Sequence, residues 1–227
     1  MKLSVIIPAY NEAATLGEVV GRVRSTARAG LDLEIIVVDD GSTDGTAAAL
    51  QASGVRLLRH ETNMGKGAAI RTGLTRATGD AVIIQDADLE YDPADYHPIL
   101  EAMRREGVAV VYGSRILGRN PHSYLRFYYG GRVLTALFNW LYGTRLTDLT
   151  TCYKAFRRET IQELPLTCRG FEFCPEVTAR LARRGARIVE IPITYHPRSI
   201  EEGKKIRWHD GLKALRTMVA LRWRRRV

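Results

Sequence analysis

Polar and acidic side chains cluster directly after three short apolar runs of this chain. The first run leads into Pro8-Ala9-Tyr10-Asn11-Glu12, the second into residues 39–44 (DDGSTD) and the third into residues 86–90 (DADLE). Such runs indicate buried strands, and in open parallel sheets ligands bind beyond the carboxyl ends of the strands. The three clusters therefore predict a single crevice.

The pair Asp86 and Asp88 has the chemistry to hold a divalent cation. Mg²⁺ and Mn²⁺ prefer oxygen ligands and take one or two carboxylates, which leaves positions for phosphates and water. Glu90 would add another oxygen, and the cation would neutralise charge on a nucleoside-diphosphate leaving group. Paired aspartates are also common in turns and caps, but their place after a buried strand favours the metal site.

The cluster at residues 39–44 combines a capping pattern with an extra acidic pair. Ser42 or Thr43 would cap a following helix, with Asp44 near its positive end. Capping does not require Asp39 and Asp40 together, so an aspartate here is a candidate hydrogen-bond acceptor for a nucleobase.

Two further patterns have weaker signals. Pro8, Tyr10 and Glu12 are consistent with a ligand contact and equally with a plain strand-to-helix turn. Residues 63–67 (NMGKG) lack the GxxxxGK[ST] spacing of a P-loop. A glycine-rich helix start with Lys66 beside it still predicts a modest anion site.

The elements that position these residues alternate between strand and helix in the first half of the chain. This alternation of apolar strands and helices predicts one α/β domain with a mainly parallel sheet covered on both faces. The second half is expected to hold an aromatic helix, two more strands, a further helix and a basic amphipathic helix at the end. The expected strands are Leu3–Ile7, Glu34–Val38, Val55–Leu58, Ala81–Ile84, Val108–Tyr112, Cys152–Phe156 and Ile188–Tyr195. The expected helices are Glu12–Ala27, Thr43–Ala52, Gly65–Ala77, Pro93–Arg105, Tyr124–Tyr142, Pro175–Arg183 and His209–Arg226.

Composition limits the class of protein. The chain has 227 residues, of which 45% are hydrophobic and 26% charged, as in a soluble globular domain. The net charge of +9 predicts an anionic partner, such as a phosphorylated ligand, a membrane surface or a nucleic acid. Three cysteines without CxxC spacing indicate neither a disulfide framework nor a zinc site, and favour a reducing compartment. The N-terminal apolar run is too short for a signal peptide, and no stretch is long enough to span a membrane.

As an ordered set, the motifs resemble the family 2 glycosyltransferases of the GT-A fold, which is Rossmann-like. The resemblance is strongest to the branch with dolichyl-phosphate mannose synthases and polyprenyl-phosphate sugar transferases. It covers almost the whole chain and rests on PAYNE, VDDGSTDGT, NMGKG, DADLE, GSR, TDLTTCYKAF, GFEFCPE and HPRSIEEGKKI. It implies a donor half at 1–115, an acceptor half at 116–206 and a basic helix at 207–227.

The resemblance also implies roles for single residues. On the donor side, Pro8, Tyr10, Glu12 and Asp40 would contact the nucleotide. Asp86 and Asp88 would serve donor and metal, with Glu90 where some relatives have a metal-binding Gln. On the acceptor side, Arg115, Arg126 and Lys205 would meet phosphate. The chain departs from the mannose synthases at Gly203-Lys204-Lys205, which lacks their Ser, and at TDLTTCYKAF. These departures leave the donor sugar and the acceptor open.

The residues also bear on mechanism. A lipid phosphate has a second pKa near 6, so it is mostly dianionic at neutral pH and attacks without a general base. Arg115, Arg126 and Lys205 would then bring two anions together. With an alcohol acceptor, Asp148 or Glu176 would be the candidate base. The family implies inversion at the anomeric carbon. The expected donor is of the GDP-mannose or UDP-glucose type, and UDP-N-acetylhexosamine is also open.

Three functions remain open at this point. The first is transfer of a hexose to polyprenyl or dolichyl phosphate, and the second is a metal-dependent transfer to a soluble acceptor. The third, a nucleic-acid-binding module, is suggested only by charge, and no binding motif accompanies it. The basic C-terminal helix would rest on an anionic leaflet or pack on the domain. The expected location is the cytoplasm, peripherally at the inner face of the membrane, where a membrane-protein partner would also lie; nucleic acid is not an expected partner.

Overall fold

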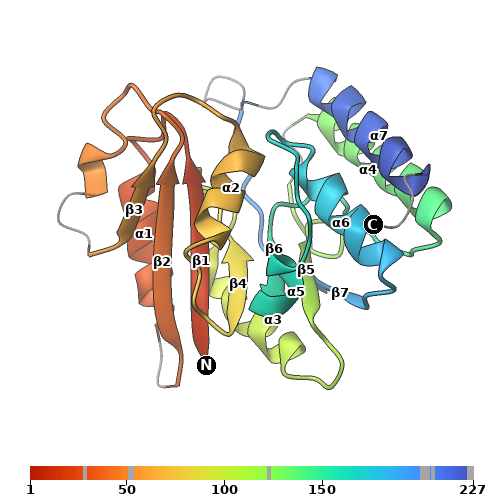
Figure 1. Ribbon diagram of the computed structural model, residues 1–227, viewed down its shortest axis with the longest axis horizontal. Helices are drawn as coiled ribbons and strands as arrows, with labels where there is room; N and C mark the ends of the chain where they lie inside the picture. The colour runs from red at the N-terminus through yellow and green to blue at the C-terminus, as the bar shows by residue number, and fades with distance from the viewer. Residues whose placement is uncertain (28–29, 51–53, 122–123, 200–204, 206–207, 224–227) are drawn as a thin grey trace.

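A computed structural model describes residues 1–27, 30–50, 54–121, 124–199, 205 and 208–223 of the chain. These residues form one α/β domain around a seven-stranded sheet of order β3-β2-β1-β4-β6-β5-β7 (Figure 1). Only β6 runs antiparallel to its neighbours among the described strands. The strands are β1 Lys2–Ala9, β2 Asp32–Asp39, β3 Arg56–Arg59, β4 Ala81–Ile84, β5 Val110–Ser114, β6 Lys154–Arg157 and β7 Ile188–Pro192.

Helices cover both faces of the sheet, and alternate strand residues supply the two cores. On one face Val5 and Ile7 pack with α1 (Leu16–Ser25) and α3 (Tyr96–Met103). On the other, Ile6 packs with the helices α2 (Lys66–Leu74), α5 (Arg158–Gln162) and α6 (Phe173–Arg183). Because successive side chains point to opposite faces, uninterrupted apolar strands such as VIIP require this double covering. The predicted fold class is confirmed.

A third core lies outside α6, where α4 (Leu125–Tyr142) and α7 (Trp208–Trp223) pack on one end of the molecule (Figure 1). The Tyr142 hydroxyl donates to the Met218 carbonyl at 2.8 Å, and Arg222 Nε donates to the Leu141 carbonyl at 2.8 Å. The C-terminal helix thus packs on the domain through one side. Among the described residues, no helix has both the length and the apolar character needed to cross a membrane.

The expected helix over Thr43–Ala52 is wrong in the part that the structure describes. Residues 43–47 form a turn, and only a short 3-10 helix, Ala48–Leu50, follows. Gly45 has a φ of +86°, which breaks the helical path, and the Thr46 hydroxyl accepts the Glu12 amide at 2.9 Å. Hydrogen bonds to another loop therefore override the local helical pattern.

Other boundaries differ by a few residues. The first helix begins at Leu16 rather than Glu12, because the chain turns at Asn11, whose φ is +51°. The short helix α5 was not predicted. Residues 51–53, Gly203, Lys204 and the basic end Arg224–Arg226 of the predicted C-terminal helix lie outside the described residues.

Candidate active site

The loops after β1 and β2 are joined by side-chain hydrogen bonds, as a shared crevice requires. The Asn11 amide donates to Ser42 Oγ at 2.9 Å, and the Thr43 amide donates to Asn11 Oδ1 at 2.9 Å. The Thr15 hydroxyl, at the start of α1, donates to the Ala87 carbonyl at 2.6 Å and so ties in the loop after β4. The structure therefore brings the three predicted clusters together.

Asp40 holds the glycine turn in place. Its carboxylate accepts the amides of Met64 at 2.9 Å and Gly65 at 2.7 Å, and its Oδ1 lies 2.6 Å from His60 Nδ1. The side chain is almost fully buried. The structure thus gives Asp40 a positioning role, while its direct contact with a nucleotide stays a prediction.

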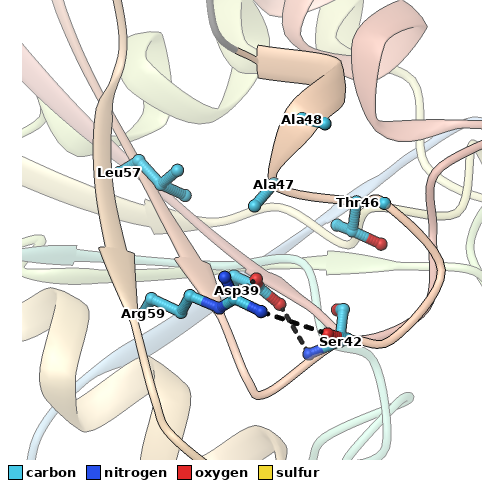
Figure 2. A pocket seen from close by; sticks show the side chains of 8 residues that line it. Asp39, Ser42, Thr46, Ala47, Ala48, Leu57 and Arg59 are labelled. Carbon is cyan, nitrogen blue, oxygen red and sulfur yellow. Dashed lines mark hydrogen bonds and ion pairs between the residues drawn. The ribbon is translucent and has the colours of Figure 1, made fainter.

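Asp39 lies beside an open cavity of about 310 Å³ at the ends of β2 and β3 (Figure 2). Its Oδ1 accepts the Ser42 amide at 2.9 Å, and its Oδ2 is 3.3 Å from Arg59 Nε. That Oδ2 is buried and receives no hydrogen bond. A planar donor such as a nucleobase N–H would satisfy it, so Asp39 joins Asp40 as a candidate for the base contact predicted at residues 39–44.

Asp86 and Lys66 form a close ion pair between the loop after β4 and the start of α2. Lys66, the first residue of α2, places its Nζ 2.5 Å from Asp86 Oδ1 and 2.9 Å from Cys152 Sγ. Burial opposes the charge of Lys66, but Asp86 outweighs it and raises the lysine pKa well above its ordinary value. The Lys66 ammonium, which the sequence predicts as part of an anion site, is therefore paired with Asp86, the first aspartate of the DxD pair.

Asp88 lies directly before a strained turn. The next residue, Leu89, has a φ of +62°, a conformation that is costly for a side chain of this size. Burial, and then the charges of Asp86 and Glu90, raise the pKa of Asp88 to about 7. Crowded carboxylates of this kind favour a cation that would relieve their repulsion.

Glu90 uses its carboxylate to hold the segment after β7. Its Oε2 accepts the Tyr195 hydroxyl at 3.0 Å, and its Oε1 accepts the Arg198 amide at 2.8 Å. Among the described residues, no group of three or more His, Cys, Asp or Glu side chains forms a ready metal site. Asp86 and Asp88 are carboxylates of the kind that Mg²⁺ or Mn²⁺ uses beside a diphosphate. Metal ligation by Asp86, Asp88 and Glu90 stays a prediction.

Arg198 is a site residue that the sequence analysis did not assign. Its guanidinium donates to both carboxylate oxygens of Glu12, each at 3.2 Å, and to Asp88 Oδ2 at 3.0 Å. Lys205 reaches the same place: its Nζ lies 2.6 Å from Glu12 Oε1 and donates to the Tyr10 carbonyl. Two cations from the end of the chain thus neutralise the acidic crevice. The only sequence signal for Arg198 is its place in the HPRSIEEGKKI motif.

Arg115 forms a bidentate pair with Asp148. Its Nε and Nη2 donate to the two carboxylate oxygens at 2.7 and 2.8 Å, and Nη2 also donates to Thr150 Oγ1 at 2.7 Å. Burial would raise the pKa of Asp148, but the Arg115 guanidinium overcomes this and lowers it. The orientation of Arg115 is therefore fixed, and Asp148 is a poor general base.

Glu176, the other candidate base, is also fully engaged. Its carboxylate accepts the amides of Thr167 and Cys168, and Arg180 pairs with it at 2.8 Å. Burial would raise its pKa, but the Cys168 amide and Arg180 lower it. The structure therefore does not support Asp148 or Glu176 as bases for an alcohol acceptor.

The remaining predicted residues are Pro8, Tyr10 and Arg126. Pro8 is half-buried at the end of β1, and Lys205 Nζ lies 5.7 Å from the centre of the Tyr10 ring. Arg126 is exposed in the first turn of α4, where its guanidinium stacks on Tyr124 and Phe127 at 5.3 and 5.1 Å. Its part in binding an acceptor stays a prediction.

A mainly parallel α/β sheet with buried carboxylates at its carboxyl edge defines an α/β domain of the class that binds ligands beyond the ends of its strands. Residues 4–164 match the family model described as Glycosyl transferase family 2. The chain belongs to this family.

Several characterised relatives extend the similarity beyond the matched region. The chain is 34% identical to the undecaprenyl-phosphate mannosyltransferase of Micrococcus luteus, over 90% of this chain and 87% of that protein. It is 30% identical to the glycosyltransferase AglJ of Haloferax volcanii, over 86% of this chain. It is also 30% identical to the dolichol-phosphate mannosyltransferase of Pyrococcus furiosus, over 90% of this chain. The chain spans only 63% and 59% of these last two proteins.

Solved structures show the same fold. The glucosyl-3-phosphoglycerate synthase of Mycobacterium tuberculosis, in complex with Mn²⁺, UDP and glucosyl-3-phosphoglycerate, superposes with a TM-score of 0.75. The identity is 24%, over 97% of this chain and 79% of that one. The GT-A fold predicted from the motifs is confirmed.

Proposed function

We propose that this protein transfers a hexose from a nucleoside-diphosphate sugar to a polyprenyl or dolichyl phosphate, with inversion at the anomeric carbon. The observation that carries the proposal is the bidentate pairing of Asp148 with Arg115. It engages a candidate base and fixes the orientation of the Arg115 guanidinium, whose remaining N–H groups can meet a phosphate. This arrangement suits a phosphate acceptor, which needs cations around it and no base.

The similarity to the undecaprenyl-phosphate mannosyltransferase supports the same acceptor, because it extends over nearly the whole of both chains. The departures at Gly203-Lys204-Lys205 and TDLTTCYKAF keep the exact acceptor open, and keep the donor open among GDP-mannose, UDP-glucose and UDP-N-acetylhexosamine. As part of the proposal, residues 1–115 bind the donor, residues 116–206 receive the acceptor, and the described helix α7, Trp208–Trp223, belongs to the basic segment 207–227.

The reaction follows from the residues around the crevice. Asp39, Asp40, Pro8 and Tyr10 bind and orient the nucleotide, while Lys66 lies beside the position of the diphosphate. Arg115, Arg126 and Lys205 draw in the acceptor phosphate, whose oxygen attacks the anomeric carbon as the bond to the diphosphate breaks. Asp86 and Asp88 would hold Mg²⁺ or Mn²⁺, as the crowding that raises the Asp88 pKa favours, and the ion would offset charge on the leaving group.

The proposal includes a peripheral position at the cytoplasmic face of a membrane. One side of α4 exposes Leu125, Tyr129, Val133 and Trp140, and one side of α7 exposes Trp208, Leu212, Val219 and Trp223. Lys213, Arg216 and Arg222 add positive charge to α7. Apolar helix sides with basic neighbours suit the boundary of an anionic leaflet.

The test uses purified protein with labelled GDP-mannose or UDP-glucose, Mn²⁺ and undecaprenyl or dolichyl phosphate, followed by solvent extraction. We expect label in the organic phase, dependent on both lipid phosphate and metal. Label in an aqueous product formed with a soluble phosphorylated acceptor would favour the second function. Absence of transfer with every donor would refute the proposal.

A further inference from the structure

Two of the three cysteines lie side by side next to the DxD pair. Cys152 Sγ is 3.9 Å from Cys174 Sγ, although the residues are 22 positions apart. Cys152 precedes β6 and is half-buried, while Cys174 lies in the first turn of α6 and is buried. The third cysteine, Cys168, contacts Glu176 through its backbone amide.

The separation of the two sulfur atoms is close to that of a disulfide. An S–S bond is about 2.0 Å long, so the atoms would have to approach by about 2 Å, which is the scale of a side-chain rotation. Both segments are anchored: the Cys152 amide donates to the Tyr91 hydroxyl at 3.2 Å, and the Cys174 thiol lies 3.4 Å from the Thr151 carbonyl. The pairing therefore belongs to the folded arrangement of the loop and the helix.

The pair also contacts the machinery of the proposed donor site. Lys66 Nζ has two close partners, Cys152 Sγ at 2.9 Å and Asp86 Oδ1 at 2.5 Å. A bond to Cys174 would draw the Cys152 sulfur away from Lys66 and end its use as a hydrogen-bond acceptor for the lysine. Of these two partners, Lys66 would then keep only Asp86. The Lys66 ammonium and the Asp86 carboxylate would both shift beside the proposed position of the diphosphate.

We infer that Cys152 and Cys174 are a reversible redox pair in the floor of the crevice, and that their oxidation to a disulfide weakens binding of the nucleotide donor. The effect on the donor rests on the proposed function; the formation of the bond does not. In a reducing compartment such disulfides are transient and act as redox sensors.

The chemistry balances with a small disulfide compound as the oxidant. One cysteine attacks a sulfur of the oxidant and forms a mixed disulfide, releasing one thiol; the other cysteine displaces the second thiol. The two cysteines lose two protons and two electrons in total, and the oxidant is reduced to two thiols. The hydrogen bond from Cys152, with the charges of Lys154 and Lys66, lowers the pKa of Cys174, which favours the thiolate form that attacks in such an exchange.

The test exposes the reduced full-length protein to oxidised glutathione and measures its intact mass and its linked peptides. We expect a loss of about 2 Da, from two thiol hydrogens, a peptide pair joining Cys152 to Cys174, and reversal by dithiothreitol. Cys168→Ser is the matched control and should form the same bond, because Cys168 is not expected to take part in it. Burial and then Glu176 raise the pKa of the Cys168 thiol to about 12, which disfavours its reactive thiolate. Cys174→Ser should lose no such mass. A bond through Cys168, or glutathione adducts alone on the wild type, would overturn the pair.

Donor binding is measured on the same samples by titration with UDP and GDP in Mg²⁺. The wild type and Cys168→Ser should each bind the preferred nucleotide at least fivefold more weakly when oxidised than when reduced. The affinity of Cys174→Ser for the nucleotide should be the same before and after the oxidant. Equal affinity in both redox states would refute the effect on the donor. If the reduced protein binds no nucleotide, the proposed function fails together with that effect, while the mass change still decides whether the pair forms.

Discussion

Asp88 is the residue through which metal chemistry can be tested most directly. Its Oδ2 faces Arg198, and its carboxylate is crowded by Asp86 and Glu90. We expect Asp88→Asn to lower metal-dependent turnover by roughly two orders of magnitude, because one of two anionic ligands is lost. Turnover with saturating Mn²⁺ is the measurement, and circular dichroism checks the fold. Full activity in this variant would rule out Asp88 as a ligand.

The same residue predicts a pH effect on the metal-free protein. The pKa of Asp88 is about 7 in the folded chain, against an ordinary 3.8, so the folded state binds its proton more tightly than the unfolded state. Stability from this group is therefore present below the ordinary value and is lost as the pH rises to about 7.

In EDTA, the wild type should lose stability relative to Asp88→Asn as the pH rises from about 5 to about 8, because the asparagine side chain at position 88 does not titrate. Urea midpoints of both proteins at the two pH values measure the difference. If the difference between the two urea midpoints were the same at both pH values, the pKa of Asp88 would not be raised.

Arg198 competes with a metal for the acidic crevice. Its guanidinium pairs with both Glu12 and Asp88, so a cation that binds these carboxylates has to displace it. We expect Arg198→Gln to bind Mn²⁺ severalfold more tightly when no nucleotide is present, as titration calorimetry can measure. Arg104→Gln is the control, because Arg104 is exposed and pairs only with Glu101 among its described contacts. Unchanged or weaker Mn²⁺ binding in Arg198→Gln would contradict the competition.

At the scale of elements, the sequence predicts the sheet and the acidic pair for the same physical reason. Apolar runs such as AVII at 81–84 have to be buried on both faces, and the polar residues that follow emerge at one edge. The place of Arg198 in the site was not predicted, because its partner Glu12 lies 186 positions away in the sequence. No local sequence pattern indicates a contact over that separation. The turn at residues 43–47 was misread because bonds to Asn11 and Glu12 outweigh its helical propensity.

The glycine turn before α2 tests how precisely an element must be placed. Gly65 has a φ of +97°, and an added Cβ would lie 2.5 Å from the Arg169 carbonyl oxygen. We expect Gly65→Ala to destabilise the protein by about 1 to 3 kcal/mol and to weaken nucleotide binding, because Lys66 is the next residue.

Thermal unfolding and nucleotide titration measure the two effects of Gly65→Ala. Gly21→Ala is the matched control: Gly21 lies within α1 and has nothing within 4 Å of the added Cβ, so alanine should be neutral or stabilising there. If Gly65→Ala behaved like Gly21→Ala, the turn would not be under the constraint described.

At the scale of the whole molecule, the proposed membrane contact combines the net charge with the exposed apolar sides of α4 and α7. Trp140 is 80% exposed and Trp223 is 66% exposed, each on a helix whose other side packs into the third core. The protein carries a net charge of +9. A basic residue near an anionic leaflet contributes about 1 kcal/mol, and buried tryptophan adds apolar contact.

We therefore expect the protein to float with vesicles that contain anionic phospholipid, and less with zwitterionic vesicles. Trp140→Ser should reduce flotation severalfold through lost apolar contact. Arg216→Glu should also reduce flotation, and its effect should be larger at low salt than at high salt, because salt screens the attraction between the protein and the anionic lipid. Leu117→Ser is the control, since Leu117 is 48% exposed but lies outside both helices. If no variant changes flotation and sedimentation instead shows a dimer broken by Trp140→Ser, the helix sides bind a second copy of the chain. In that case the lipid acceptor would have to reach the crevice without the help of these two helices.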